Sequence, residues 1–127
     1  MERRKVERIT VLVVGEHRAF AEAMALAVGR EAGLSARATA NAQGSTGADP
    51  GREPEVVLID LPLPGANGIE RIRQVREDHP NASVIVLSAH EEDLLKARAV
   101  EAGAAGFLSD LAPFDEVLAS VRRVAGG

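Results

Sequence analysis

The sequence predicts an α/β fold built on a doubly wound five-stranded parallel sheet, and three observations lead to this prediction. Short runs rich in Val, Ile and Leu, such as ITVLVV and EVVLID, alternate with longer segments of helical period. These runs read as nearly continuous Val, Ile and Leu, which is typical of strands that are buried on both faces of a parallel sheet. Right-handed crossovers between such strands place helices on both sides of the sheet.

The expected strands are residues 9–14, about 35–39, 55–60, 82–88 and 105–108, and the expected helical segments are 17–33, 68–80, 91–103 and 113–127. In the first helical segment, Phe20, Met24 and Val28 recur every four residues, with Ala23 and Ala27 beside them. We expect Gly33 to end that helix. The apolar stripes of the other three helices are, in order, Ile69, Ile72 and Val75; Leu94, Leu95, Ala97, Val100 and Gly103; Val117, Leu118, Val121 and Val124. Pro80 ends the second of the four helices.

One connection breaks the alternation. The segment ANAQGSTGADPGREP, residues 40–54, holds three glycines and two prolines and has no large apolar side chain. A helix there would have no stripe to bury and would lose about 1 kcal/mol at each internal glycine. The helix after the second strand is therefore predicted to be weak or missing.

Length and composition limit the class of protein. A chain of 127 residues with 46% hydrophobic content suits one domain, which we place at 9–125, after a charged leader at 1–8 and before the start of a linker at 126–127. The net charge of −4 does not favour nucleic acid or anionic lipid. The chain has no cysteine and no apolar run that could span a membrane. We expect a cytoplasmic protein without a membrane partner.

The residues that directly follow the predicted strands lie at the usual place of the functional crevice in open α/β sheets. They are Gly15, Glu16 and His17 after the first strand, Asp60 after the third, Ser88, Ala89 and His90 after the fourth, and Ser109 and Asp110 after the fifth. His17, His90 and Glu16 could also form a transition-metal site, although such histidines more often start a helix or lie in a solvated loop.

Four stretches together, VVGEH, VVLIDLPLPGANG, VIVLSAH and GAAGFLSD, resemble the receiver domain of bacterial two-component response regulators. The resemblance spans Ile9 to about Val124 and is closest to the subgroup that precedes a NarL/LuxR-type helix-turn-helix domain. It implies a flavodoxin-like fold and a DNA-binding domain after Gly127. It further implies these roles: phosphoacceptor for Asp60, phosphoryl-binding hydroxyl for Ser88, switching aromatic for Phe107 and turn proline for Pro64.

This chain departs from the family pattern at the site that would bind metal and phosphate. Gly15 and Glu16 replace the acidic pair, and Asp110 replaces the lysine. Mg²⁺ requires compact octahedral oxygen ligation, which a missing and a lengthened acid disrupt. At about 6 Å and an effective dielectric constant of about 20, each like-charge pair among Glu16, Asp60 and Asp110 costs about 3 kcal/mol. We therefore expect no metal and no cofactor.

The preferred interpretation is an atypical, phosphorylation-independent receiver domain that is not an enzyme. It would act as a homodimer or by binding a small molecule or protein, through the first and last helices or through the 91–103, 105–108 and 113–127 segments. The alternative is a conventional Mg²⁺-dependent receiver in which Glu16 and Asp60 hold the metal and Asp60 accepts the phosphoryl group. Purely structural roles stay open for Asp60, Ser88 and Phe107. A phosphatase-like use of Asp60 is disfavoured, because Pro62 stands where the leaving group would need an acid.

Overall fold

The computed structural model describes residues 8–39, 53–61, 66–89 and 93–126. Several predictions fall outside these ranges. They concern most of the charged leader, the weak or missing helix within 40–52, the turn that holds Pro64, the loop that holds His90, and residue 127.

Five parallel strands form one sheet, as predicted. They are β1 (Ile9–Val14), β2 (Leu34–Thr39), β3 (Val56–Leu61), β4 (Ser83–Ser88) and β5 (Ala104–Ser109). The order across the sheet is β2-β1-β3-β4-β5, so β1 lies inside the sheet and the chain winds outward in both directions from it. The carboxyl ends of all five strands therefore meet at one edge.

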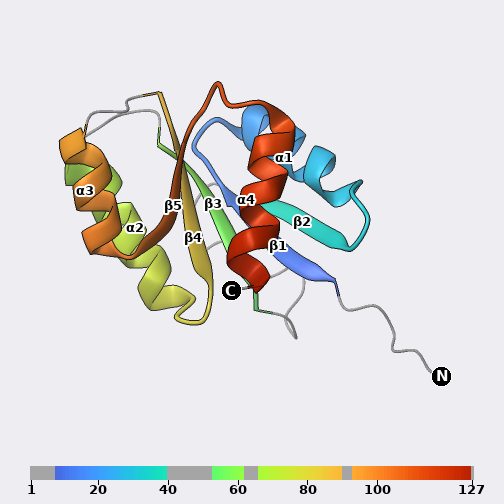
Figure 1. The fold of residues 1–127 in the computed structure, drawn as a ribbon, viewed down its shortest axis with the longest axis horizontal. Coiled ribbons are helices and arrows are strands. Elements are labelled where there is room, and N and C mark those ends of the chain that lie inside the picture. Colours follow the sequence, from blue (N-terminus) through green and yellow to red (C-terminus); the bar gives the residue numbers. More distant parts are fainter. Residues whose placement is uncertain (1–7, 40–52, 62–65, 90–92, 127) are drawn as a thin grey trace.

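The described helices cover both faces of the sheet (Figure 1). Helices α1 (Arg18–Gly29) and α4 (Phe114–Gly126) lie on one face, and α2 (Ala66–Asp78) and α3 (Asp93–Ala102) lie on the other. Each face has its own apolar core, because alternate strand residues point to opposite sides. Val11 and Val13 belong to the α1/α4 core, whereas Leu12 and Val14 belong to the α2/α3 core.

Helix α1 differs from its prediction in stripe and in length. Its buried residues are Ala21, Ala25 and Val28, while Phe20 and Met24 pack at the margin and Ala23 is exposed. The helix ends at Gly29, before the predicted Gly33. Gly33 instead has a φ of +80° in the turn that leads into β2, a conformation that favours glycine.

Helix α3 corrects the sequence prediction more strongly. Leu95 and Ala99 are buried, but Leu94 and Val100 are 65% and 63% exposed. The apolar residues of this short helix are distributed around its whole circumference, so their spacing does not single out one buried face. The predicted stripes of the other two helices are confirmed: Ile69, Ile72 and Val75 are buried on α2, which ends before Pro80, and Val117 and Val121 are buried on α4.

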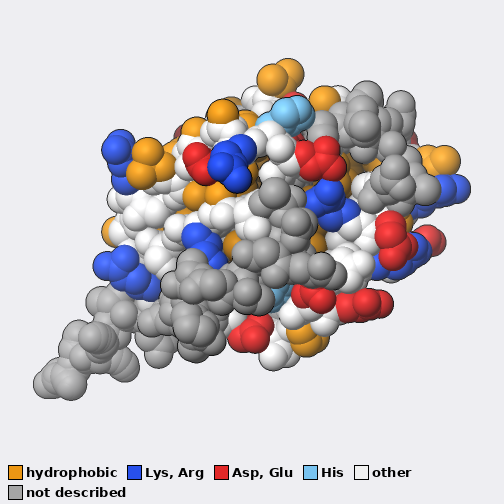
Figure 2. Space-filling view, turned by 180° about the vertical axis from the view of Figure 1, so that it is seen from behind, with side chains coloured by type: hydrophobic (Ala, Val, Ile, Leu, Met, Phe, Trp, Pro, Cys, Tyr) orange, Lys and Arg blue, Asp and Glu red, His pale blue; other side chains and the backbone are white. Residues whose placement is uncertain are grey.

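Charges of both signs are distributed over the surface. Figure 2 shows acidic and basic side chains interspersed on the face that it presents. Within the described part of the chain, every helix is too short or too polar to cross a bilayer.

Candidate functional site

The carboxyl edge of the sheet brings the predicted site residues to one end of the molecule. Asp60 lies near the end of β3 and is only 8% exposed. Gly15 follows β1, and its backbone N–H donates to the Thr39 carbonyl at 3.1 Å, which fixes the start of the β1–α1 loop. Asp110 follows β5 and is exposed.

Gly15 lies directly against Asp60. A Cβ built on Gly15 would stand 3.4 Å from the Asp60 Cβ and 3.5 Å from the Ala21 Cβ, which is close to ordinary van der Waals contact. Its φ is not positive, since the only positive-φ glycines among the described residues are Gly33 and Gly103. The backbone therefore does not require glycine here, and this position lacks its carboxylate without a conformational reason.

Asp60 is held in an environment that disfavours its charge. Burial, followed by the nearby charge of Asp110, raises the pKa of the Asp60 carboxyl, and Glu16 adds to this effect. His17 opposes it, because its Nδ1 lies 3.9 Å from Asp60 Oδ2. His17 is also the N-cap residue of α1, but its side chain makes no capping hydrogen bond.

Glu16 is engaged by a residue that the sequence analysis missed. Arg71 Nη2 on α2 donates to Glu16 Oε2 at 2.9 Å, and the Arg71 side chain is only 25% exposed. The like-charge repulsion expected among Glu16, Asp60 and Asp110 is therefore partly relieved by a cation, Arg71, that the sequence analysis did not include. Arg71 lies in the second turn of the helix that starts beside the crevice, and a basic residue at that position was the available signal.

Asp110 is less constrained. Its backbone N–H donates to the Ser88 carbonyl at 3.0 Å, which ties the β5–α4 loop to the end of β4. Two nearby basic side chains are engaged elsewhere: Arg18 faces Glu22 at 3.9 Å, and the Lys96 ammonium lies 5.9 Å from the Phe107 ring centroid. The negative charge of Asp110 therefore acts on Asp60 and raises the pKa of that carboxyl.

Ser88 and Phe107 occupy the other side of the crevice. Ser88 is fully buried and pairs in register with Leu61, one residue beyond Asp60. Phe107 on β5 pairs with Val86 and packs against the α2/α3 core. Strand alternation places both side chains toward α2 and α3. Their positions fit either the structural or the switching role.

The residues present do not fit an octahedral Mg²⁺. Gly15 offers no side-chain ligand, Glu16 is committed to Arg71, and Asp60 alone is a carboxylate buried at the site. No described cluster of three or more His, Asp or Glu side chains could hold a metal ion. His90, part of the transition-metal alternative, lies outside the described residues.

Comparisons with known proteins place the chain. Residues 11–122 match the response regulator receiver domain family. Over 75 residues, or 59% of this chain, it is 36% identical to the response regulator GacA of Pseudomonas aeruginosa. Over 73 residues, or 58% of the chain, it is 38% identical to the response regulator UvrY of Escherichia coli K12. These matches span about a third of each relative, 35% and 34%.

Solved structures agree over nearly the whole chain. The receiver domain of the putative response regulator NarL from Mycobacterium tuberculosis is 27% identical, with a TM-score of 0.76 over 95% of this chain and 98% of that one. A response regulator from Thermotoga maritima is 25% identical, with a TM-score of 0.80 over 94% of this chain and 99% of that one. The chain belongs to the family of response regulator receiver domains.

Proposed function

We propose that this receiver domain works without phosphorylation, as the interaction module of a transcriptional regulator. The observation that carries the proposal is the glycine at position 15, which leaves Glu16 as the acid on this side, and that acid pairs with Arg71 at 2.9 Å. The first-strand side of the crevice, where a metal would need two free acids, offers one acid that is already neutralised. An aspartyl phosphate at Asp60 would therefore lack its counterion.

Electrostatics supports the same conclusion. Phosphoryl transfer to a carboxylate depends on cations that neutralise the charge developing on the phosphoryl oxygens. Burial and Asp110 already favour the neutral form of Asp60, so the site resists even one negative charge. The acyl phosphate would carry between one and two negative charges at neutral pH, in place of the single charge of the carboxylate. The domain is accordingly proposed to need no cofactor and to catalyse no reaction of its own.

The output would come from outside this chain. NarL/LuxR-type regulators carry a helix-turn-helix domain, and the relatives GacA and UvrY are about three times the matched length. DNA contact is assigned to such a domain, since this chain has a net charge of −4. The receiver domain would control it from the cytoplasm by self-association, or by binding a small molecule or a protein.

The test is phosphorylation itself. The purified chain is incubated with acetyl phosphate and Mg²⁺, and its intact mass is followed, with Asp60→Asn as the matched control. We expect no phosphoryl adduct in either protein and no change of oligomeric mass. An adduct on the wild-type chain that Asp60→Asn abolishes would establish the conventional phosphoacceptor function instead.

The same variant tests the biological role. In the full-length regulator, Asp60→Asn is expected to leave transcriptional output within about twofold of wild type, which corresponds to less than about 0.5 kcal/mol. A phenotype equal to deletion of the gene, with normal protein levels, would contradict the proposal.

A further inference from the structure

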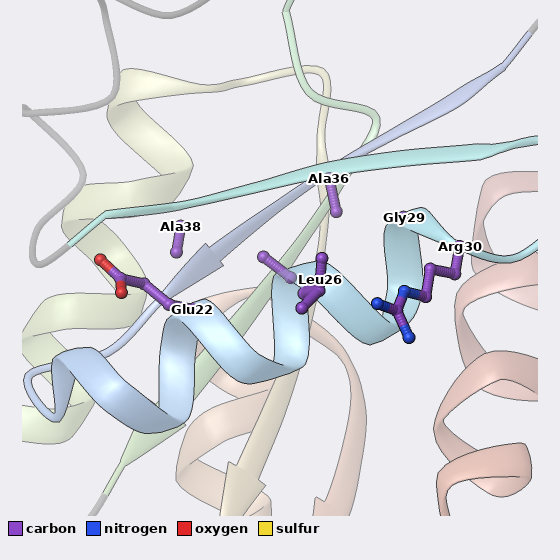
Figure 3. A pocket seen from close by; sticks show the side chains of 7 residues that line it. Glu22, Leu26, Gly29, Arg30, Ala36 and Ala38 are labelled. Atoms are coloured by element: carbon purple, nitrogen blue, oxygen red, sulfur yellow. The ribbon is translucent and has the colours of Figure 1, made fainter.

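Helix α1 and strand β2 enclose an open groove at the edge of the molecule, away from the crevice. Its volume is about 470 Å³. Small side chains and a glycine form its floor, and Leu26 stands beside it with 60% of its surface exposed. Figure 3 shows Leu26 midway along α1, between Glu22 and Arg30, with Ala36 and Ala38 across from the helix on β2.

The charges around the groove have a symmetry that points to its occupant. Glu22, Leu26 and Arg30 follow one another at intervals of four residues, so they share one face of the helix. Glu22 and Arg30 are thus equidistant from Leu26, about 6 Å along the axis on either side, and have opposite charges. A second α1, laid antiparallel across the first at Leu26, would place each Glu22 opposite an Arg30.

The shape is self-complementary as well. The exposed Leu26 is a projection, and Gly29, Ala36 and Ala38 beside it form a hollow without large side chains. A two-fold interface uses the same patch on both chains, so each Leu26 would enter the hollow of the other chain. Strand β2 is an edge of the sheet, so no other described strand flanks it on this side.

The contacts that Glu22 and Arg30 make within the chain do not prevent them from pairing with a second copy. Glu22 meets Arg18 at 3.9 Å, but both side chains are largely exposed, and such a pair contributes little. Arg30 has no ion pair among the described residues. Both are therefore available at the rim.

We propose that the α1–β2 groove is a homodimer interface, in which each Leu26 packs into the hollow of the second copy beside the two-fold axis and Glu22 pairs with Arg30 of the second copy. This deepens the proposed function and rests on its element of self-association. It shares α1 with the pair of first and last helices considered from the sequence but joins it to β2 in place of α4, and it is separate from the α3, β5 and α4 surface.

The first experiment measures mass against concentration by sedimentation velocity. The wild-type chain is expected to form dimers at high concentration. Leu26→Ala removes the central contact and is expected to weaken dimerisation at least about tenfold. Leu94→Ala is the matched control, because Leu94 is equally exposed but lies on α3, and it should leave the mass unchanged.

The second experiment uses charge reversal. Glu22→Arg and Arg30→Glu each place like charges opposite one another, so each variant alone should be monomeric. An equimolar mixture should form a heterodimer, because every contact then joins opposite charges, and the double variant should dimerise again. Circular dichroism melting shows that each variant is folded.

Three results would overturn the proposal: a monomeric wild-type chain at every concentration, a dimer that Leu26→Ala leaves intact, or variants that do not recover on mixing. The two proposals can fail separately. If the chain dimerises and its charge-reversal variants recover on mixing, but it also accepts a phosphoryl group, the proposed phosphorylation independence is wrong and this interface stands. A monomer that accepts no phosphate would do the reverse.

Discussion

The two sides of the crevice differ in what they retain. On the β4–β5 side, Ser88 is buried at the end of its strand and Phe107 packs into the α2/α3 core, where the receiver family has its switching pair. On the β1 side, Glu16 is the one acid at the two positions where the family has an acidic pair, and its carboxylate accepts a hydrogen bond from Arg71. The β4–β5 side therefore keeps the family's residues within the packed core, whereas the β1 side departs from the family pattern at Gly15.

This difference separates residues that stabilise the fold by packing from residues that would act only on a bound ligand. Buried side chains are retained because each stabilises the core, and removing one costs free energy of unfolding. Charged ligands at the crevice stabilise nothing until their metal binds, since their mutual repulsion is unfavourable. An ion pair such as Glu16–Arg71 relieves that repulsion without any ligand.

The largest expected effect comes from rebuilding the β1 side. The triple variant Gly15→Asp, Asp110→Lys and Arg71→Gln supplies the missing acid, supplies the missing ammonium and frees Glu16. It is expected to gain Mg²⁺ affinity from an undetectable level to roughly 1 mM, or about −4 kcal/mol. Isothermal titration calorimetry measures this directly.

The matched control for that variant has Gly15→Ala in place of Gly15→Asp. It adds the same Cβ, which the site accommodates, but no carboxylate. If both variants remain without Mg²⁺ affinity, the loss of ligands is not what distinguishes the two sides.

Removing Phe107 sharpens the comparison on the packed side. Phe107→Ala is expected to lower the free energy of unfolding by about 2 kcal/mol, below the range for fully buried phenylalanines because the ring is only partly buried. Urea denaturation measures this loss. Leu111→Ala, at an 88% exposed position, is the control and should change stability little. A similarly small change for Phe107→Ala would deny it a packing role.

Asp60 gives a pH-dependent prediction. Its pKa is raised in the folded protein above the usual value for an aspartate, so the native state holds this proton more tightly than the unfolded state. The contribution of Asp60 to stability is therefore most favourable below about pH 4 and is lost as the pH rises through the folded pKa.

Asp60→Asn removes this titration. It is expected to be more stable than wild type by about 1 kcal/mol at pH 7, with the difference shrinking toward pH 4. Urea denaturation across that pH range is the measurement. A variant that is less stable than wild type at pH 7 would show that the charged carboxylate is favourable in its site.

The smallest effect is expected from the ion pair itself. Arg71→Gln should cost less than about 1 kcal/mol, because Glu16 is 60% exposed and solvent screens the pair. Thermal unfolding at low and high salt should show the cost fading as salt rises. A cost that exceeds this limit and is insensitive to salt would indicate a buried structural role for Arg71.

The sequence predicted the sheet well because its strands are apolar on both faces, a pattern with one good structural solution. The stripes on α2 and α4 were equally clear, since Ile69, Ile72 and Val75 fall on one face among charged residues. The helix α3 was predicted, but its buried face was not, because its apolar residues lie on all of its sides. Its buried face is decided by contact with α2 and β5, which no local pattern reports.

The site was predictable in membership but not in its contacts. Asp60, Gly15, Glu16 and Asp110 were identified from motifs, whereas Arg71 lies 55 residues from Glu16 in the sequence. Such a pair depends on the rotation of α2 about its axis and on the reach of a long side chain. Both are properties of tertiary packing.

The most direct test is a titration of the wild-type chain with Mg²⁺, without and then with beryllofluoride, followed by amide NMR. We predict that the signals of Gly15, Asp60 and Asp110 stay unchanged at millimolar Mg²⁺ and after beryllofluoride is added. Saturable shifts of these signals that are lost in Asp60→Asn would contradict the claim that this crevice has given up phosphoryl chemistry.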